Sequence, residues 1–216
     1  MKFQGLFLLL LGTALVSHAQ IFSAHSPGLH WSKLTSEEVN ILFPKELKQK
    51  AEQVYQQIKR FYDTDSSLGL NRFKLNLVLQ NQTVRSNGYV GIGPFISEFF
   101  LTPPFDSYVL GSVDWTEALT IHEYRHVLQA MNSRKGIAQW LYWILGEEAW
   151  GAAYGLAVPD WFLEGDAVAA ETRNTPGGRG RMPSFAAEYR ALFQSNIQWP
   201  YIKTRNGSLK DIVPPE

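Results

Sequence analysis

The sequence has no cysteine among its 216 residues. The chain therefore cannot form a disulfide bond, hold a metal ion through thiolates or carry a lipid on an N-terminal cysteine. The composition is still compatible with export from the cytoplasm, because a lack of cysteine excludes only the disulfide bonds that are common in exported proteins.

The sequence also lacks an excess of charge of either sign. Its 20 Lys and Arg residues balance its 20 Asp and Glu residues, so we predict no nucleic-acid partner. With 45% hydrophobic and 19% charged residues, the composition is that of an ordinary folded chain and excludes wholesale disorder. The length indicates one domain, which could have two lobes.

Long apolar runs are few, and the first of them has the features of a secretory signal over residues 1–19. Lys2 precedes an apolar run over residues 3–16, which is too short to span a membrane comfortably, and residues 17–19 form a small-x-small cleavage site. An uncleaved membrane anchor is the alternative. We expect residues 20–216 to form an exported domain, periplasmic or secreted, with no stable membrane span after signal cleavage. This domain could be the N-terminal module of a longer protein.

The second apolar run, residues 137–158, is rich in tryptophan and could be taken for a transmembrane helix. Glu147, Glu148 and three glycines argue against that, because acidic groups at bilayer depth are costly. We predict a buried or cleft-covering helical hairpin. Plain core packing is the simpler role for most of its aromatic side chains, and a role as a lid or in a substrate pocket is the alternative.

Hydrophobic periodicity predicts the remaining elements. Strands are expected over residues 39–43 and 73–79, with an amphipathic helix over residues 45–62 between them. A strand at the sheet edge is expected over residues 96–101, and Ser184 is expected to cap a last helix. This order predicts an α+β fold, in which a small mixed sheet is followed by a short, mainly helical C-terminal lobe.

The most informative stretch is HEYRH, which places His122 and His126 four residues apart. On a helix such residues share one face, so both imidazoles can reach the same metal ion. Glu123 is one step round the helix, beside such an ion, where a general base for an activated water belongs. Asp114 as N-cap and Glu117 three residues later predict the start of this helix as a capping box.

Glu164, in the stretch PDWFLEGDA, offers a third ligand. Pro159 and Asp160 predict a helix start with Asp160 as N-cap, which places Glu164 in about the first turn. A catalytic zinc ion takes three protein ligands and keeps one position open. His122, His126 and Glu164 would supply that set and leave a net positive charge that acidifies a bound water.

The stretches HEYRH and WFLEGDA together resemble the gluzincin zinc metallopeptidases, in the wording of their aminopeptidase-like and peptidase-MA-like branches. The resemblance covers residues 110–170. It implies a zincin-like fold, one Zn²⁺ per chain on His122, His126 and Glu164, and hydrolysis of a peptide or protein substrate with Glu123 as the base. It also implies a sheet-edge strand that pairs with the substrate backbone, at the position of residues 96–101.

This sequence departs from the family pattern in two respects. The linker between His126 and Glu164 is longer than in the compact aminopeptidases, and Val168 stands where thermolysin-like enzymes have an aspartate that orients a ligand imidazole. Asp166 and Glu171 are candidates for that orienting role, although each could equally be a solvated acid.

Other side chains are candidates for contact with a substrate. Arg179 or Arg181, in the loop after the Glu164 helix, could bind a carboxylate or a carbonyl, although a solvated loop is the simpler reading. A donor to the oxyanion would have to be a tyrosine, because no histidine follows the second ligand in the sequence. The candidates are Tyr154, Tyr189 and Tyr201.

Two alternatives to an active peptidase stay open. One is a non-catalytic zinc-binding or interaction module of a larger exported protein, which the short C-terminal lobe favours and the intact Glu123 disfavours. The other is a chance coincidence of the two stretches in a protein that binds no metal.

Overall fold

The computed structural model describes residues 28–64, 73–105, 113–200 and 202–203. Its centre is a five-stranded sheet in the order β1-β2-β3-β5-β4. The strands are β1 (Trp31–Thr35), β2 (Val39–Pro44), β3 (Leu75–Gln80), β4 (Gly88–Gly91) and β5 (Ile96–Phe100). β2, β3 and β5 run parallel to one another, whereas β1 and β4 are antiparallel to their neighbours at the two edges. The predicted α+β class and the mixed sheet are confirmed.

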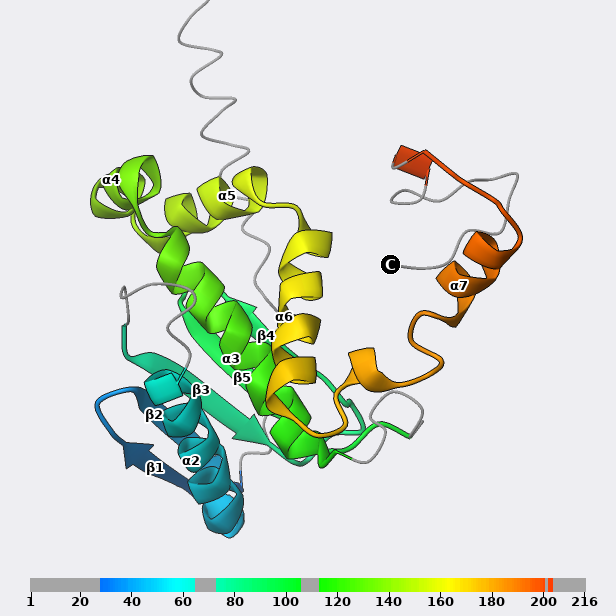
Figure 1. Cartoon of the computed structure of the whole chain (residues 1–216). Helices are drawn as coiled ribbons and strands as arrows, with labels where there is room; N and C mark the ends of the chain where they lie inside the picture. The colour runs from blue at the N-terminus through cyan, green and yellow to red at the C-terminus, as the bar shows by residue number, and fades with distance from the viewer. Residues whose placement is uncertain (1–27, 65–72, 106–112, 201, 204–216) are drawn as a thin grey trace, which may run out of the picture.

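Helices cover one face of this sheet (Figure 1). α2 and α3 lie against the strands, α6 packs along α3, and α4 and α5 form a hairpin between α3 and α6 in the chain. The helices are α2 (Lys48–Thr64), α3 (Trp115–Ser133), α4 (Gly136–Leu145), α5 (Glu147–Ala157), α6 (Asp160–Asn174) and α7 (Ala187–Gln194), with short 3-10 helices η1 (Lys45–Leu47) and η3 (Arg179–Arg181).

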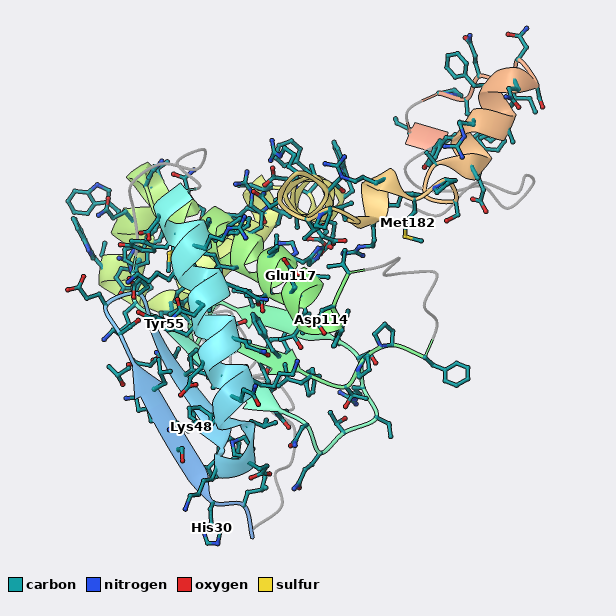
Figure 2. All side chains as sticks on the ribbon, turned by 60° about the horizontal axis from the view of Figure 1, so that its bottom comes forward. His30, Lys48, Tyr55, Asp114, Glu117 and Met182 are labelled. Atoms are coloured by element: carbon teal, nitrogen blue, oxygen red, sulfur yellow. The ribbon has the colours of Figure 1, made fainter. Side chains whose placement is uncertain are left out.

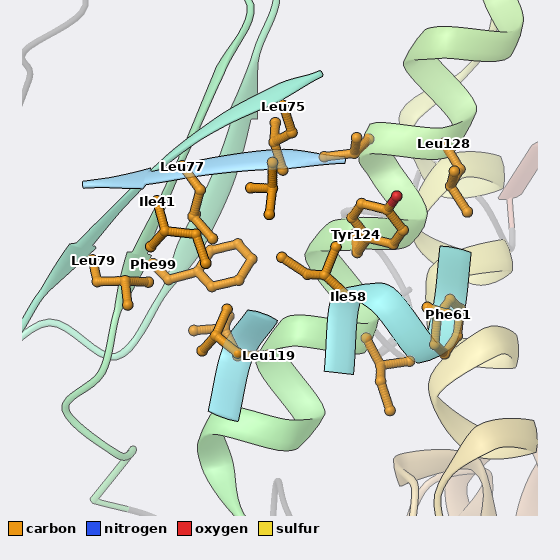
Figure 3. Packing of buried hydrophobic residues seen from close by; sticks show 14 of the residues in the cluster. Ile41, Ile58, Phe61, Leu75, Leu77, Leu79, Phe99, Leu119, Tyr124 and Leu128 are labelled. Carbon is orange, nitrogen blue, oxygen red and sulfur yellow. The ribbon is translucent and has the colours of Figure 1, made fainter. Parts of the chain in front are cut away.

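The core lies between the sheet and the helices α2 and α3. Apolar residues at helical spacing on α2, among them Val54, Ile58 and Phe61, are buried and face the sheet. Figure 3 shows Ile58 and Phe61 next to Tyr124 of α3, and the Phe61 and Tyr124 rings meet edge to face at 6.4 Å. This packing places the polar face of α3 away from the sheet, towards α6.

The strand predicted for the sheet edge lies inside the sheet instead. β5 pairs with β3 on one side and with β4 on the other, and its residues from Ser97 to Phe100 are all buried. β4 comes before β5 in the chain but lies outside it, with Gly88 opposite Phe99. The predicted position of the edge strand was therefore wrong by one strand, because spatial order differs from chain order here.

The hairpin of α4 and α5 was predicted as buried or cleft-covering, and the buried alternative is wrong for most of it. Its exposed apolar side chains are Ile137, Trp140, Trp143, Ile144, Leu145 and Leu156. Trp150 anchors the hairpin, since its buried ring packs on Phe95 and Tyr142 and its Nε1 donates to Ser133 Oγ at 2.9 Å.

The C-terminal segment beyond η3 leads away from the sheet and from α3. Figures 1 and 2 show α7 apart from the rest of the described chain, beyond Met182. The expected last helix is present, but Ala186 rather than Ser184 occupies its N-cap position. Residues 1–19, predicted as a signal, and Tyr201 lie outside the described residues.

None of the helices in the described ranges combines the length and the apolar character needed to cross a membrane. α4 has only ten residues, and α3, which is longer, carries acidic and basic side chains along its length. The tryptophan-rich run therefore forms two short helices and no span.

Candidate metal centre

α3 carries the HEYRH stretch through the middle of the fold. Asp114 caps its start, as predicted, because the carboxylate Oδ1 accepts hydrogen bonds from the backbone N–H groups of Thr116 (2.9 Å) and Glu117 (3.2 Å). Figure 2 shows Asp114 and Glu117 together at this end of the helix. The helix places His122 and His126 one turn apart, with their Nε2 atoms 3.3 Å from each other.

α6 brings Glu164 to the two histidines. The N-cap of this helix is Pro159, not Asp160 as predicted, and Asp160 is the first helical residue. The carbonyl of Pro159 accepts from the N–H of Phe162 at 3.0 Å, so the backbone already closes this first turn. Glu164 lies one turn further along, where its side chain points at α3.

The Nε2 atoms of His122 and His126 converge with the two carboxylate oxygens of Glu164, and we call these three residues the ligand triangle. Glu164 Oε2 lies 3.2 Å from His122 Nε2, Glu164 Oε1 lies 3.3 Å from His126 Nε2, and the two ring nitrogens are 3.3 Å apart. Within the part of the chain that the structure describes, His122, His126 and Glu164 are the group of residues that converge closely enough to hold a metal ion. The predicted ligand set is thus brought together.

The close approach of these side chains shifts the pKa values of His122 and Glu164. Burial lowers the pKa of His122, but the hydrogen bonds with Glu164 and Glu171 outweigh it and raise that pKa to about 9. The same bonds with His122 and His126 hold the pKa of Glu164 well below its ordinary range. The triangle therefore favours positive charge.

Glu123 lies beside the triangle and next to the edge strand. Its side chain is buried, and burial raises its pKa. Gly88 of β4 touches it so closely that a Cβ at Gly88 would lie 2.7 Å from Glu123 Cγ. The glycine is thus required by the close approach of the strand to the carboxylate, and sequence reasoning did not identify it.

Behind His126 stands a chain of polar side chains from both helices. His126 Nδ1 lies 2.8 Å from Gln129 Oε1, and Gln129 Nε2 donates to Asp166 Oδ2 at 2.7 Å. Arg125 is paired with the same carboxylate through Nε at 2.7 Å and Nη2 at 2.9 Å. Asp166, a predicted candidate for orienting an imidazole, thus reaches the ring through Gln129.

Neither Gln129 nor Arg125 was identified from the sequence. The available signal was spacing, because Gln129 follows His126 by three residues and so lies on the same face of α3. Arg125 gave no such signal. Its role depends on the position of α6, and it is a charged side chain buried almost completely.

Behind His122 stand Glu171 and Arg179. Glu171 is buried, and its Oε2 lies 3.6 Å from His122 Nδ1. The Arg179 guanidinium holds that carboxylate through Nε and Nη2, and Nη2 also lies 2.8 Å from His122 Nδ1. Burial raises the pKa of Glu171, but the bonds with His122 and Arg179 prevail and lower it to about 2. Glu171, which could have been a solvated acid, is buried and lies beside Nδ1 of the His122 ring.

The two loop arginines lie in different surroundings. Arg179 was one of two candidates for contact with a substrate, with a solvated loop as the simpler reading. Its guanidinium contacts Glu171 and His122 instead. Arg181 is exposed and donates from Nε to the carbonyl of Thr172 at 3.0 Å, so this contact ties it to the backbone of α6.

Two cavities flank the triangle, one of about 320 Å³ and one of about 390 Å³. Both are lined by Asn87, His122, Glu123 and Glu164. The smaller cavity also has walls from β4, from α6 and from Tyr154 of α5. Of the predicted tyrosines, Tyr154 alone is placed at the site among those the structure describes, since Tyr189 is exposed on α7.

No protein-family model, curated protein or solved structure matches this chain. We therefore infer the chemistry of the site from its own side chains. Two imidazole nitrogens and a carboxylate converge on one point beside a buried carboxylate, and the cavities give a small molecule or an extended chain access to that point.

Proposed function

We propose that this chain is an exported zinc-dependent peptidase of the gluzincin type, with a zincin-like fold and one Zn²⁺ per chain. The observation that carries the proposal is the convergence of His122, His126 and Glu164. The two Nε2 atoms lie 3.3 Å apart, and each lies 3.2 or 3.3 Å from one of the two Glu164 carboxylate oxygens. In a tetrahedral zinc site with ligands at about 2.0–2.1 Å, neighbouring donor atoms are about 3.3–3.4 Å apart, so the separation of the two ring nitrogens fits this ion.

The donor types also favour zinc over other common ions. Mg²⁺ and Ca²⁺ prefer cages of oxygen atoms, whereas two imidazoles with one carboxylate suit zinc. His122, His126 and Glu164 line the smaller cavity, so a bound ion would have room for a fourth ligand, as a catalytic site requires. Bound zinc would supply a Lewis acid that acidifies a water molecule and polarises a carbonyl group.

Glu123 is the proposed general base. It lies on the shared wall of both cavities and is buried, and burial raises its pKa above the ordinary range of a carboxyl group. A carboxylate of raised proton affinity can accept a proton from the attacking water and pass it to the leaving amine. Tyr154 is the proposed hydrogen-bond donor to the carbonyl oxygen, since it lines the smaller cavity.

A peptide or protein is the proposed substrate because strand β4 borders the site. Gly88, Tyr89 and Val90 line the smaller cavity, and among the described strands β4 pairs with β5 alone. An extended peptide could therefore add to the outer edge of β4 by backbone hydrogen bonds. β4 takes the role that the family resemblance implied for residues 96–101.

A non-catalytic metal-binding module is the second candidate. The position of α7 favours it, because this helix stands away from the site instead of covering it (Figure 1). The buried Glu123 disfavours it, since a purely structural ion has no use for a carboxylate with raised pKa beside an open cavity.

The first experiment compares the metal content of the mature wild-type protein with that of Glu164→Ala. About one zinc per chain in the wild type and a large loss in the variant are expected, because a catalytic zinc needs all three ligands. Glu188→Ala, which removes an exposed carboxylate on α7, is the matched control. Zinc bound equally by all three proteins would refute the ligand set.

The second experiment separates the two candidate functions. Glu123→Gln is expected to retain zinc but to lose hydrolysis of unfolded protein substrates by about 10²–10⁴-fold, the usual contribution of a general base. Full activity in this variant would refute the mechanism. A zinc-loaded wild type that cleaves none of a broad panel of peptides would favour the non-catalytic module.

A further inference from the structure

We propose that the smaller cavity beside the ligand triangle binds a positively charged group of the substrate, an ammonium or guanidinium ion, and that Asp160 recognises this group. The inference rests on the proposed function, because it names the substrate class of the same site. Asp160 then gives the peptidase a preference for peptides with a positive charge close to the cleaved bond.

The smaller cavity extends from the ligand triangle towards the start of α6. Asp160 and Glu164 are four residues apart on this helix, so they share one face and lie one turn apart. On α3, Ala130 lines the same cavity and follows His126 by four residues. The cavity therefore continues along both helices to one side of the proposed ion, with Asp160 at its far end.

Negative charge prevails on the walls of this cavity. Its carboxylates are Glu123, Asp160 and Glu164, and among the described residues no lysine or arginine lines it. Glu164 is the proposed metal ligand and Glu123 the proposed base, so Asp160 is the carboxylate of these walls that has no part in that chemistry. The larger cavity differs, because Arg179 lines it next to Glu171. A cation is therefore favoured in the smaller cavity.

Asp160 is free to bind a ligand. Its side chain is exposed and, within the described part of the chain, forms no hydrogen bond or ion pair with another side chain. Asp166 on the same helix is instead held by Arg125 and Gln129. Burial raises the pKa of Tyr154, and the nearby Asp160 carboxylate raises it further. The charge of Asp160 thus acts on the wall that Tyr154 forms.

The spacing fits a peptide that is cleaved at the ligand triangle. Four helical residues rise by about 6 Å, whereas an extended peptide rises by about 3.3 Å per residue. A lysine or arginine within about two residues of the cleaved bond can therefore bring its charge to Asp160. The α-ammonium group of a peptide that begins in this cavity can do the same.

The other walls of the cavity suit a lysine or arginine side chain. Val90, Ile92 and Leu163 line the cavity and offer apolar surface for the aliphatic stem of such a side chain. The charged end then lies at the exposed end of the cavity, where Asp160 stands.

Asp160 also has a structural use, because a negative charge in the first turn stabilises a helix. A role confined to the helix predicts that replacing Asp160 changes the Tm but not the choice of peptide. Discrimination between peptides is therefore the quantity to measure.

The test uses alanine peptides with a fluorophore at the C-terminus and lysine, norleucine or glutamate at one internal position. Norleucine has the carbon stem of lysine without its charge. Fluorescence anisotropy gives their dissociation constants on Glu123→Gln prepared with excess zinc, the reference protein, which should bind without cleaving them. With acetylated N-termini, the lysine peptide should bind about 2–5-fold more tightly than the norleucine peptide, the range of an exposed ion pair. An uncharged peptide with a free or acetylated N-terminus tests the α-ammonium group in the same way.

Variants in the reference protein assign the preference to one side chain. Asp160→Asn should abolish it, and Asp160→Lys should reverse it in favour of the glutamate peptide, which a helix-stabilising role does not predict. Glu188→Gln, which neutralises an exposed carboxylate on α7, should retain it. The preference of the reference protein should also shrink in about 1 M salt, where the Debye length is about 3 Å, and this readout needs no variant at Asp160.

The outcomes separate the source of the charge and the two proposals. A preference for the free N-terminus alone, lost in Asp160→Asn, would make the α-ammonium group the bound cation. Equal binding of charged and uncharged peptides, a preference that survives Asp160→Asn or high salt, or no binding of any peptide would each overturn the cation site. Zinc binding and cleavage without the preference would leave the proposed function intact. A preference that depends on Asp160 in a protein that binds no zinc would refute that function and leave the cation site.

Discussion

The arrangement of the site depends on the absence of a side chain at Gly88. Its backbone lies against Glu123, and a Cβ there would come within 2.9 Å of the carboxylate Oε1. Atoms this close repel each other strongly, so either the strand or the carboxylate would have to move. The position of the proposed base is thus set by the edge strand as well as by the helix that carries it.

Gly88→Ala is accordingly expected to reduce peptidase activity by about 10²-fold, because a misplacement of about 1 Å can cost that much. Zinc content should be unchanged, since the ligand triangle is not touched. Gly155→Ala is the control, because a Cβ at Gly155 meets nothing within 4 Å. Steady-state hydrolysis and metal analysis of both variants test this, and full activity in Gly88→Ala would contradict it.

At the scale of single residues, the sequence predicted what helical spacing determines. His122 and His126 had to share a face of α3, and Glu164 followed from the start of a second helix. Gln129 and Arg125 escaped prediction, because their contacts depend on how α6 lies on α3. For the same reason the contacts of Arg179 with Glu171 and His122 were not predicted, since the sequence left it as a solvated loop residue or a substrate contact.

At the scale of elements, the α4–α5 hairpin is held by one buried side chain. Trp150 packs between Phe95 and Tyr142, and its indole N–H bonds to Ser133 Oγ. The exposed side chains of α4 contribute little to this anchoring. The wall that Tyr154 gives to the smaller cavity therefore depends on Trp150, one turn earlier on α5.

Trp150→Ala should destabilise the fold by about 3–5 kcal/mol, the usual cost of removing a large buried aromatic ring. Trp143→Ala, which removes a side chain 61% exposed, should cost far less, near the ±0.5 kcal/mol of surface changes. Urea unfolding curves of the two variants measure the difference. Similar losses in both would mean that Trp150 is not the anchor.

Hydrophobic periodicity predicted most of the helices and strands, but it did not predict which of them would lie side by side. The strands at residues 39–43 and 73–79 and the helix from residue 45 are present within a few residues of their expected bounds. The edge strand was misplaced, because β4 is short and rich in glycine and gives little alternation to detect. Exposure of α4 could not be predicted either, since an apolar run does not tell which neighbours will cover it.

At the scale of the whole molecule, a metal ion that binds only the folded chain must stabilise it. The expected gain is about 2.7 kcal/mol at a free zinc concentration of about 100 times the dissociation constant. Thermal unfolding with zinc and with a chelator should therefore differ, and Glu164→Ala should respond to neither. An identical Tm of the wild type in both conditions would argue against binding by the folded state.

The α+β class was predicted correctly, because strands predominate in the first half of the sequence and helices in the second half. The overall shape was not predicted, in particular the position of α7 apart from the other helices (Figure 2). Residues 185–193 carry apolar side chains at helical spacing, which predicts a helix but not the surface it packs on. Phe185 and Phe193 are exposed in the structure.

The position of the ligands on two helices has a mechanical consequence for a chain without cysteine. An ion held by His126 on α3 and Glu164 on α6 would cross-link these helices and close a loop that contains the whole α4–α5 hairpin. α6 could then detach locally only if the ion left first. Hydrogen exchange of the α6 amides should therefore slow on zinc binding more than exchange in β1, which lies at the opposite edge of the sheet from β4.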